Sequence, residues 1–292
     1  MPTVYLNGQF LPLEQARIPV MDRGFLFGDG VYEVIPVYSR RPFRLHEHLA
    51  RLQASLDGIR LANPHTPAEW ESLILHLVEL ATVELAAGED LGIYLQVTRG
   101  PGPRDHAFPA QPQATVFILP LQLTPPPRAL VDNGVAAITA VDNRWLRCDI
   151  KATALLANVL LRQLSVDAGC AETLLLRDGF VSEGSASNIF VVRGGLLLAP
   201  PKSNLMLPGI TYDVVLELAR QEGIAHALRP VGEAELRSAE EIWITSSTKE
   251  VLAVVQLDGQ PVGGGRPGPL FRRMHAAYQD YKHTVMRGKE RP

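Results

Sequence analysis

Three groups in this chain could do chemistry together: a lysine, a glutamate and the start of a helix. Lys151 closes the stretch 144–151 (Arg-Trp-Leu-Arg-Cys-Asp-Ile-Lys), Glu183 opens 183–188 (Glu-Gly-Ser-Ala-Ser-Asn), and 209–211 (Gly-Ile-Thr) precedes an amphipathic pattern. A lysine amine forms Schiff bases with aldehydes, a carboxylate keeps a ring nitrogen protonated, and helix N-terminal amides bind phosphate. These are the parts needed to hold pyridoxal phosphate.

Each group also has an ordinary explanation. Lys151 stands at the start of a predicted apolar helix over 152–166, where burial, the helix end and nearby arginines would lower the pKa of its amine. Glu183 could be a solvated turn residue, and Thr211 could simply cap its helix. The neighbours of Lys151 and the order of the three groups favour the chemical interpretation.

Composition excludes several classes of protein. Of 292 residues, 46% are apolar and 20% charged, which is enough for a packed core, and the net charge of −3 speaks against nucleic-acid or polybasic membrane binding. We find no signal peptide and no apolar window long enough to span a bilayer, so we expect a cytoplasmic protein. Cys148 and Cys170 predict neither a disulfide nor a zinc site, and Cys148 is expected to be an inert thiol. We interpret His46 and His48 as surface or cap histidines and expect no metal.

Turn dipeptides organise the rest of the chain. Asn7-Gly8, Asp178-Gly179, Gly194-Gly195 and Asp258-Gly259 each predict a hairpin, because such pairs tolerate positive φ at both turn centres. Hairpins interleaved with helices predict an α/β or mixed α+β fold. Helices are expected over 46–60, 67–87, 151–168, 211–223 and 268–284, and strands over 91–99, 114–121, 135–141, 172–177, 189–198 and 242–246.

The proline run 125–127 predicts a domain boundary, because three fixed φ angles suit an extended connector. We expect a small N-terminal α/β domain over 1–121, a linker over 122–134 and a larger domain over 135–292 that holds all three cofactor elements. Residues 263–268 predict an exposed turn into the last helix.

These motifs resemble the fold-type IV pyridoxal-phosphate enzymes almost end to end, and the wording around Lys151 is most similar to the D-amino acid aminotransferases. The resemblance implies two domains, the larger with a barrel-like sheet and flanking helices. It also implies the internal Schiff-base lysine (Lys151), a ring-nitrogen partner (Glu183) with Ser185 and Ser187 hydrogen-bonded behind it, and a phosphate-binding arginine (Arg51). The remaining cofactor contacts that it implies are Leu207, Gly209, Ile210, Thr211, Ser246 and Ser247; relatives carry threonine where this chain has Ser247.

The resemblance further implies the substrate contacts. Tyr32, within Gly-Val-Tyr-Glu, would bind the substrate carboxylate together with Arg104 and His106, while Val34 and Thr248 would complete the pocket. In the family the loop 99–106 reaches the neighbouring subunit's site, which implies a homodimer.

The implied reaction moves an amino group from a D-amino acid, with D-alanine expected, to a 2-oxo acid, with 2-oxoglutarate expected. Lys151 would hold the cofactor and carry out a 1,3-proton shift. Three alternatives stay open: a branched-chain L-amino acid or (R)-amine transaminase, an aminodeoxychorismate-type lyase, and a catalytically idle pyridoxal-phosphate-binding protein. The Tyr32, Arg104 and His106 combination speaks against the first two, and the retained Lys151 and Glu183 against the third.

Overall fold

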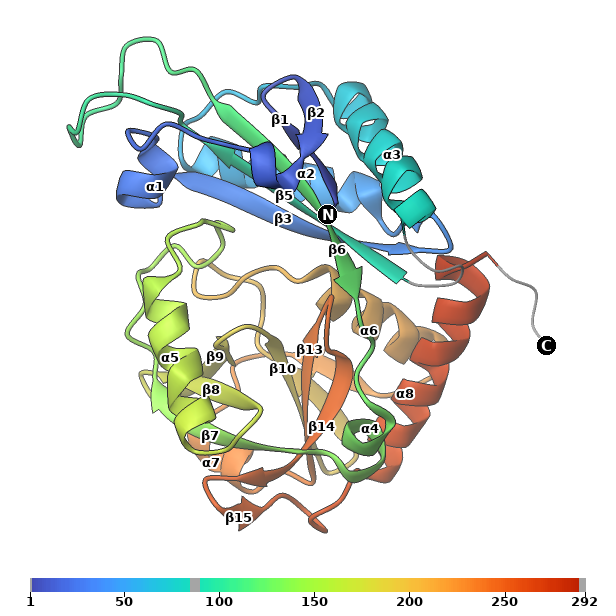
Figure 1. Cartoon of the computed structure of the whole chain (residues 1–292). Coiled ribbons are helices and arrows are strands. Elements are labelled where there is room, and N and C mark those ends of the chain that lie inside the picture. Colours follow the sequence, from blue (N-terminus) through green and yellow to red (C-terminus); the bar gives the residue numbers. More distant parts are fainter. Residues whose placement is uncertain (1, 85–89, 289–292) are drawn as a thin grey trace. The chain divides into compact units, whose positions relative to one another are not determined.

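The computed structural model describes residues 2–84 and 90–288 (Figure 1). The chain forms two compact units. Of the described residues, unit 1 comprises 2–84, 90–124, 150–155 and 286–288, and unit 2 comprises 125–149 and 156–285. Of the helices in the described ranges, none is both long enough and apolar enough to cross a membrane.

Unit 1 is a six-stranded sheet in the order β2-β1-β6-β5-β3-β4, and helices α2 and α3 pack against it (Figure 1). Trp70, Ile74 and Leu77 of α3 form the core with alternate residues of β3 and β5. The elements of unit 1 are β1 (Thr3–Leu6), β2 (Gln9–Pro12), η1 (Leu13–Gln15), α1 (Arg23–Phe27), β3 (Gly30–Tyr38), β4 (Arg41–Pro42), α2 (Leu45–Gly58), α3 (Pro67–Glu84), β5 (Asp90–Thr98) and β6 (Thr115–Leu123).

Unit 2 is built on a curled nine-stranded sheet in the order β12-β11-β10-β13-β14-β7-β8-β9, with β15 paired to β14. Helices α6 and α8 pack together and against β13, and α5 packs against β7 and β8 (Figure 1). The elements are α4 (Arg128–Asn133), β7 (Val135–Val141), α5 (Leu156–Asp167), β8 (Glu172–Arg177), β9 (Phe180–Gly184), β10 (Asn188–Arg193), β11 (Leu196–Ala199), α6 (Ile210–Gln221), β12 (His226–Leu228), α7 (Glu233–Arg237), β13 (Glu241–Ser246), β14 (Glu250–Leu257), β15 (Gln260–Pro261), α8 (Pro269–Tyr281) and η2 (Lys282–Met286).

The mixed α/β class is confirmed, as are all four predicted hairpins. Both turn residues have positive φ in each case, for example 48° and 92° at Asn7 and Gly8. This is the geometry that a two-residue type I′ turn requires. The predicted helix over 67–87 is present as α3, and its last three expected residues lie outside the described part of the chain.

Two features of the predicted organisation differ from the structure. The expected linker 122–134 contains the end of β6 and all of α4, so only 124–127 is an extended connector. The helix expected from 151 begins at Leu156, and residues 150–155 belong to unit 1. Lys151 therefore belongs to unit 1 and the other two cofactor elements belong to unit 2, whereas all three were expected in one domain.

Candidate active site

Lys151 lies in an extended segment that runs beside strand β3 in unit 1. Its carbonyl accepts a hydrogen bond from the Tyr32 amide at 2.9 Å, and its own amide donates to the Ser55 hydroxyl at 3.2 Å. Ala152 forms a β-bridge with Val31. Because the Lys151 carbonyl and amide are hydrogen-bonded to Tyr32 and Ser55, they are not available for a helix. The lysine is therefore held by contacts with β3 and α2 and not by a helix end.

Strand β3 presents two different faces, as its period of two requires. Tyr32 and Val34 are half-buried on one face, and the Lys151 amine lies 4.2 Å from the centre of the Tyr32 ring. Glu33 points to the other face and is fully buried. The structure thus brings Lys151 together with Tyr32, one of the predicted substrate contacts.

The buried face of β3 carries an ion-paired cluster with helix α2. Arg51 donates from Nε and NH2 to the two Glu33 oxygens at 2.7 and 2.8 Å, and His48 Nδ1 lies 2.8 Å from Glu33 Oε2. Arg51 and His48 hold the pKa of Glu33 well below its usual range, although burial raises it. The expectation of a surface His48 is wrong, since its side chain is fully buried, whereas His46 is exposed. Arg51 is fixed in direction by Glu33, and its phosphate-binding role stays a prediction.

The predicted carboxylate trap occupies an exposed loop of unit 1 that is anchored from beneath. The buried Arg23 side chain donates to the backbone carbonyls of residues 105, 106 and 107 and forms an ion pair with Asp29 at 2.7 Å. Above it, Arg104 and His106 both lie against the Phe27 ring, with distances to its centre of 5.9 and 5.6 Å. The structure therefore places the predicted cation and imidazole around one aromatic ring.

In unit 2, Glu183 is buried among three hydrogen-bond donors. Arg144 NH1 lies 2.6 Å from its Oε1, while Oε2 accepts from the Leu207 amide at 3.0 Å and from the Asn188 side chain at 3.3 Å. Arg144 is oriented in turn by two hydrogen bonds of 2.9 Å to Asp142. The alternative of a solvated turn glutamate is therefore wrong.

Burial raises the pKa of the Glu183 carboxyl to about 7, against the lowering by Arg144 and by the Leu207 amide. Arg144 compensates only in part because it is shared with Asp142, a second buried carboxylate. Arg144, Arg177 and Ser182 hold the pKa of Asp142 well below its usual range, although burial raises it. A protonated ring nitrogen at Glu183 would add the positive charge that favours its ionised form.

The start of helix α6 has the features of an anion site. Its N-cap is Gly209, with no side-chain cap, so Thr211 is the second helical residue and the interpretation of Thr211 as N-cap is wrong. A Cβ on Gly209 would lie 2.0 Å from Asn188 Oδ1, so this position needs glycine. Ile210 and Thr211 are buried. Because the first amides of a helix have no intrahelical acceptor, a buried start without a side-chain cap suits a phosphate.

The hydroxyl turn 246–248 follows strand β13, in which Thr245 pairs with Asn188 of β10. The Ser246 and Thr248 oxygens lie 3.3 Å apart, and Ser246 also accepts from the Lys249 amide. Among the described residues, Thr245 Oγ1 is buried without a hydrogen-bond partner. Asn188 thus contacts Glu183 and adjoins both Gly209 and β13, so unit 2 brings the carboxylate, the helix start and the hydroxyl turn together.

Sequence reasoning missed the residues that fix this cluster. Asn188 lies in the 183–188 motif but was given no role, Asp142 was not considered, and Arg144 was not predicted to contact Glu183. Arg144 was expected to act on Lys151, but it is engaged by Glu183 and Asp142, and Arg147 pairs with Asp149 at the surface. The only sequence signal for Arg144 was the unusual arginine-rich composition of the segment 144–151.

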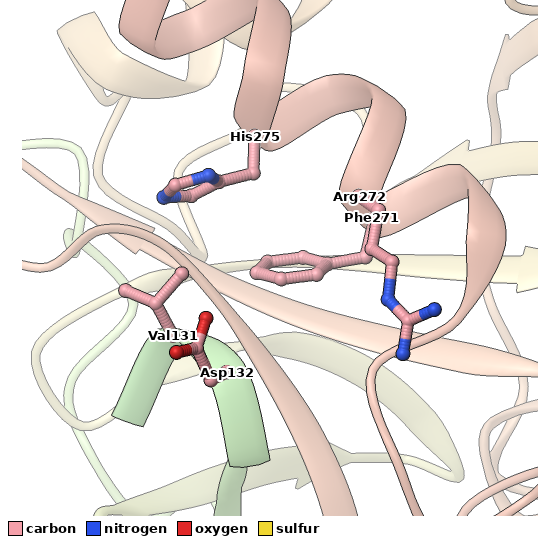
Figure 2. A pocket seen from close by; sticks show the side chains of 5 residues that line it. All are labelled: Val131, Asp132, Phe271, Arg272 and His275. Atoms are coloured by element: carbon pink, nitrogen blue, oxygen red, sulfur yellow. The ribbon is translucent and has the colours of Figure 1, made fainter. Parts of the chain in front are cut away.

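Two further features lie away from these residues. Burial raises the pKa of the Cys148 thiol to about 11, which agrees with an inert thiol. A pocket of about 350 Å³ lies between α4 and α8, and Figure 2 shows its aromatic, acidic and basic lining. Its lining residues are Val131, Asp132, Phe271, Arg272 and His275, and no predicted site residue is among them.

The sequence pattern of the amino-transferase class IV family matches residues 30–257. The chain is a class IV aminotransferase. As expected from the motifs, this aminotransferase depends on pyridoxal phosphate, the cofactor of the family.

Relatives and solved structures agree with this assignment. The D-alanine aminotransferase of Bacillus licheniformis is 41% identical and the alignment covers 95% of this aminotransferase and 96% of that protein. That of Staphylococcus epidermidis is 35% identical, with 98% and 100% covered. The branched-chain aminotransferase of Thermoproteus uzoniensis, solved with norvaline, superposes with a TM-score of 0.86 at 27% identity, covering 99% and 96% of the two chains. The branched-chain amino acid aminotransferase of Escherichia coli gives 0.86 at 25%, covering 99% and 96%. The fold-type IV identification is confirmed.

Proposed function

We propose that this aminotransferase transfers the amino group of a D-amino acid, with D-alanine as donor, to a 2-oxo acid, with 2-oxoglutarate as acceptor. The observation that carries the proposal is the pair Arg104 and His106 around Phe27 on an anchored loop. A guanidinium beside an imidazole suits a substrate carboxylate. The two D-alanine aminotransferases also support it, because they share more sequence with this chain than the two branched-chain enzymes do.

Unit 2 would hold most of the cofactor. When bound, pyridoxal phosphate supplies the aldehyde that takes the amino group and the ring that withdraws electrons. Glu183 would keep the ring nitrogen protonated, and Leu207 would contact the ring face. Phosphate would be bound by the start of α6 and the hydroxyl turn, through Gly209, Ile210, Thr211, Ser246 and Ser247, and Thr248 would contact the substrate. The buried carboxyl with its raised pKa and the buried helix start without a side-chain cap fit these tasks.

Unit 1 would supply the base and the substrate contacts. Lys151 would attach the cofactor and, once released, carry the proton between substrate Cα and cofactor with its Nζ. Its amine lies 4.2 Å from the centre of the Tyr32 ring, which places the proposed base beside a proposed substrate contact. Tyr32 and Val34 would line the pocket from their shared face of β3, and Arg51 would reach the phosphate while Glu33 fixes its direction.

A half-reaction tests the proposal. We expect D-alanine added to the holoenzyme to convert the visible absorbance band of the bound cofactor to that of the amine form, with one equivalent of pyruvate. L-alanine and L-leucine should leave the band unchanged. Conversion with L-amino acids alone would instead assign the branched-chain activity, and no conversion with any of the three amino acids would overturn the proposal.

We also propose a homodimer in which loop 99–106 reaches the neighbouring subunit's site. Helix α5 supports an interface, because it buries only Leu161 and Ser165 in the chain. Its exposed apolar side chains recur at helical spacing, with exposed fractions of 72% at Leu156, 59% at Val159 and 61% at Leu160. Contiguous exposed apolar side chains of this kind are a feature of surfaces that bind another protein. Location in the cytoplasm stays a prediction of the sequence.

Replacing Leu160 with glutamate is expected to convert the dimer to monomer, because it places a charge in the centre of the stripe, where it has no partner. Analytical ultracentrifugation measures the mass, and Leu228→Glu is the control, since Leu228 is also exposed in unit 2 but lies on β12. If L160E stays dimeric, the stripe is not the interface. If the wild-type protein is monomeric, the homodimer proposal fails.

A further inference from the structure

Another buried carboxylate of unit 2, that of Glu172, lies directly behind the turn that follows Glu183. Its side chain is fully buried and accepts hydrogen bonds at both oxygens. Oε1 accepts from the Thr173 amide at 2.9 Å and from both the amide and the hydroxyl of Ser185. Oε2 accepts from the Ser187 hydroxyl at 2.8 Å and from the Lys249 ammonium.

Glu172 therefore accounts for the composition of the 183–188 motif. Both of its serine hydroxyls bind this carboxylate, and a Cβ on Gly184 would lie 2.4 Å from Ser187 Oγ and 3.2 Å from the Glu172 carboxyl carbon. The Gly184 amide also donates to the Ser187 carbonyl at 2.6 Å, which closes the turn. Small residues are required here because the turn is folded tightly onto Glu172.

The 184–187 turn also fixes the position of the Glu183 carboxylate. Ser187, whose hydroxyl binds Glu172, is followed by Asn188, whose side-chain amide donates to Glu183 Oε2 at 3.3 Å and to the Leu207 carbonyl at 3.0 Å. At the other end of the turn, Gly184 directly follows Glu183 in the chain. The turn therefore joins Glu183 itself to Asn188, whose side chain binds the Glu183 carboxylate.

Lys249 keeps Glu172 in its charged form. Burial raises the pKa of Glu172, but the Lys249 charge and hydrogen bond, together with those of Ser185 and Ser187, lower it overall. A charged acceptor makes shorter and stronger hydrogen bonds than a neutral one. Lys249 directly follows the hydroxyl turn 246–248, so the ion pair also connects that turn to the 184–187 turn.

We propose that Glu172, charged through its ion pair with Lys249, is a positioning residue that fixes the 184–187 turn and thereby directs Glu183 at the cofactor ring. This inference rests on the proposed role of Glu183. It assigns Ser185, Ser187 and Gly184 to holding Glu172, and gives Lys249 a role that sequence analysis did not consider.

A double-mutant cycle on the affinity for pyridoxal 5'-phosphate tests the proposal, measured by titrating apoenzyme. We expect E172Q and S187A each to raise Kd about tenfold in the wild-type background, the effect of one lost interaction of about 1.4 kcal/mol. In the E183Q background the same changes should alter Kd less than twofold, since they act through Glu183. E241Q is the matched control, because Glu241 is a buried carboxylate of the same unit that accepts from Trp243, Leu270 and Phe271. It should lower Tm and leave Kd unchanged.

The outcomes separate the two proposals. If E183Q alone leaves Kd unchanged, the proposed role of Glu183 fails and the inference falls with it. If E183Q raises Kd but E172Q and S187A have no effect, or add to it fully, the inference is overturned while the proposed function stands. S187A removes a single hydroxyl, so it keeps the test decisive even where E172Q fails to fold.

Discussion

Lys151→Ala is expected to lower kcat by about 10⁴-fold or more, the upper end of what a positioned general base contributes, because it also removes the covalent attachment. The fold should persist, since the lysine is held by its backbone. The hydrogen bonds from the Tyr32 amide and to the Ser55 hydroxyl do not involve the side chain. Steady-state transamination and Tm measure the two effects.

Lys202→Ala is the matched control for this prediction. Lys202 is a half-exposed lysine that pairs with Asp213 at 2.7 Å in unit 2, and its loss should leave kcat within twofold of the wild type. Added methylamine should restore part of the K151A activity, because a free amine can take over the proton transfer. Multiple turnovers by K151A at near wild-type rate, without added amine, would remove Lys151 from the mechanism.

The parts of the fold that follow from local rules could be predicted from the sequence. The four turn dipeptides define hairpins because few residue pairs tolerate positive φ at both centres. The helix predicted over 211–223 agrees with α6 within one residue at its start and two at its end, since its apolar positions repeat at helical spacing and Gly209 marks its start. Strand β3 was not among the predicted strands, because Pro36 interrupts its pattern. A proline is tolerated there because β3 pairs on that side only with the short strand β4.

Lys151 shows where local rules fail. The apolar run after it continues the pattern of α5 backwards, which predicts helix from 151. The structure instead bonds the Lys151 carbonyl to Tyr32 and the Thr153 amide to Gly30, both in unit 1 and more than a hundred positions away in the chain. The spacing of apolar residues indicates which face of an element is buried, but it does not indicate with which strand the segment pairs.

At the candidate site, too, the sequence indicates which residue types take part but not which side chains they bind. Glu183, Gly209 and Thr211 were proposed as site residues because their motifs are specific. The partner of Glu183 was not predicted, because Arg144 binds this carboxylate from 39 residues away, and the ion pair of Arg51 with Glu33, 18 residues away, was not predicted either. His48 was assigned to the surface for the same reason, since only the partner Glu33 explains its burial.

Glu183→Gln is expected to lower kcat by about 10- to 100-fold, because losing a charge-assisted hydrogen bond costs about 1.5–3 kcal/mol and each 1.36 kcal/mol is tenfold in rate. An amide cannot hold a proton on the ring nitrogen as a carboxylate does, so electron withdrawal from Cα weakens. Removal of the Cα proton then becomes slower than the other steps. The primary isotope effect with 2-deuterated D-alanine should therefore rise in E183Q.

The isotope effect separates this role from simple destabilisation of unit 2. The glutamine keeps one oxygen and must turn an NH2 towards either Arg144 or the Leu207 amide, so Tm should fall as well. Glu235→Gln is the control, because Glu235 also pairs with an arginine, Arg229 at 2.7 Å, but is half-exposed and far from any proposed role. It should leave kcat and the isotope effect unchanged. A wild-type kcat with an unchanged isotope effect in E183Q would mean that the ring nitrogen has another partner, and that the raised pKa of Glu183 reflects its burial alone.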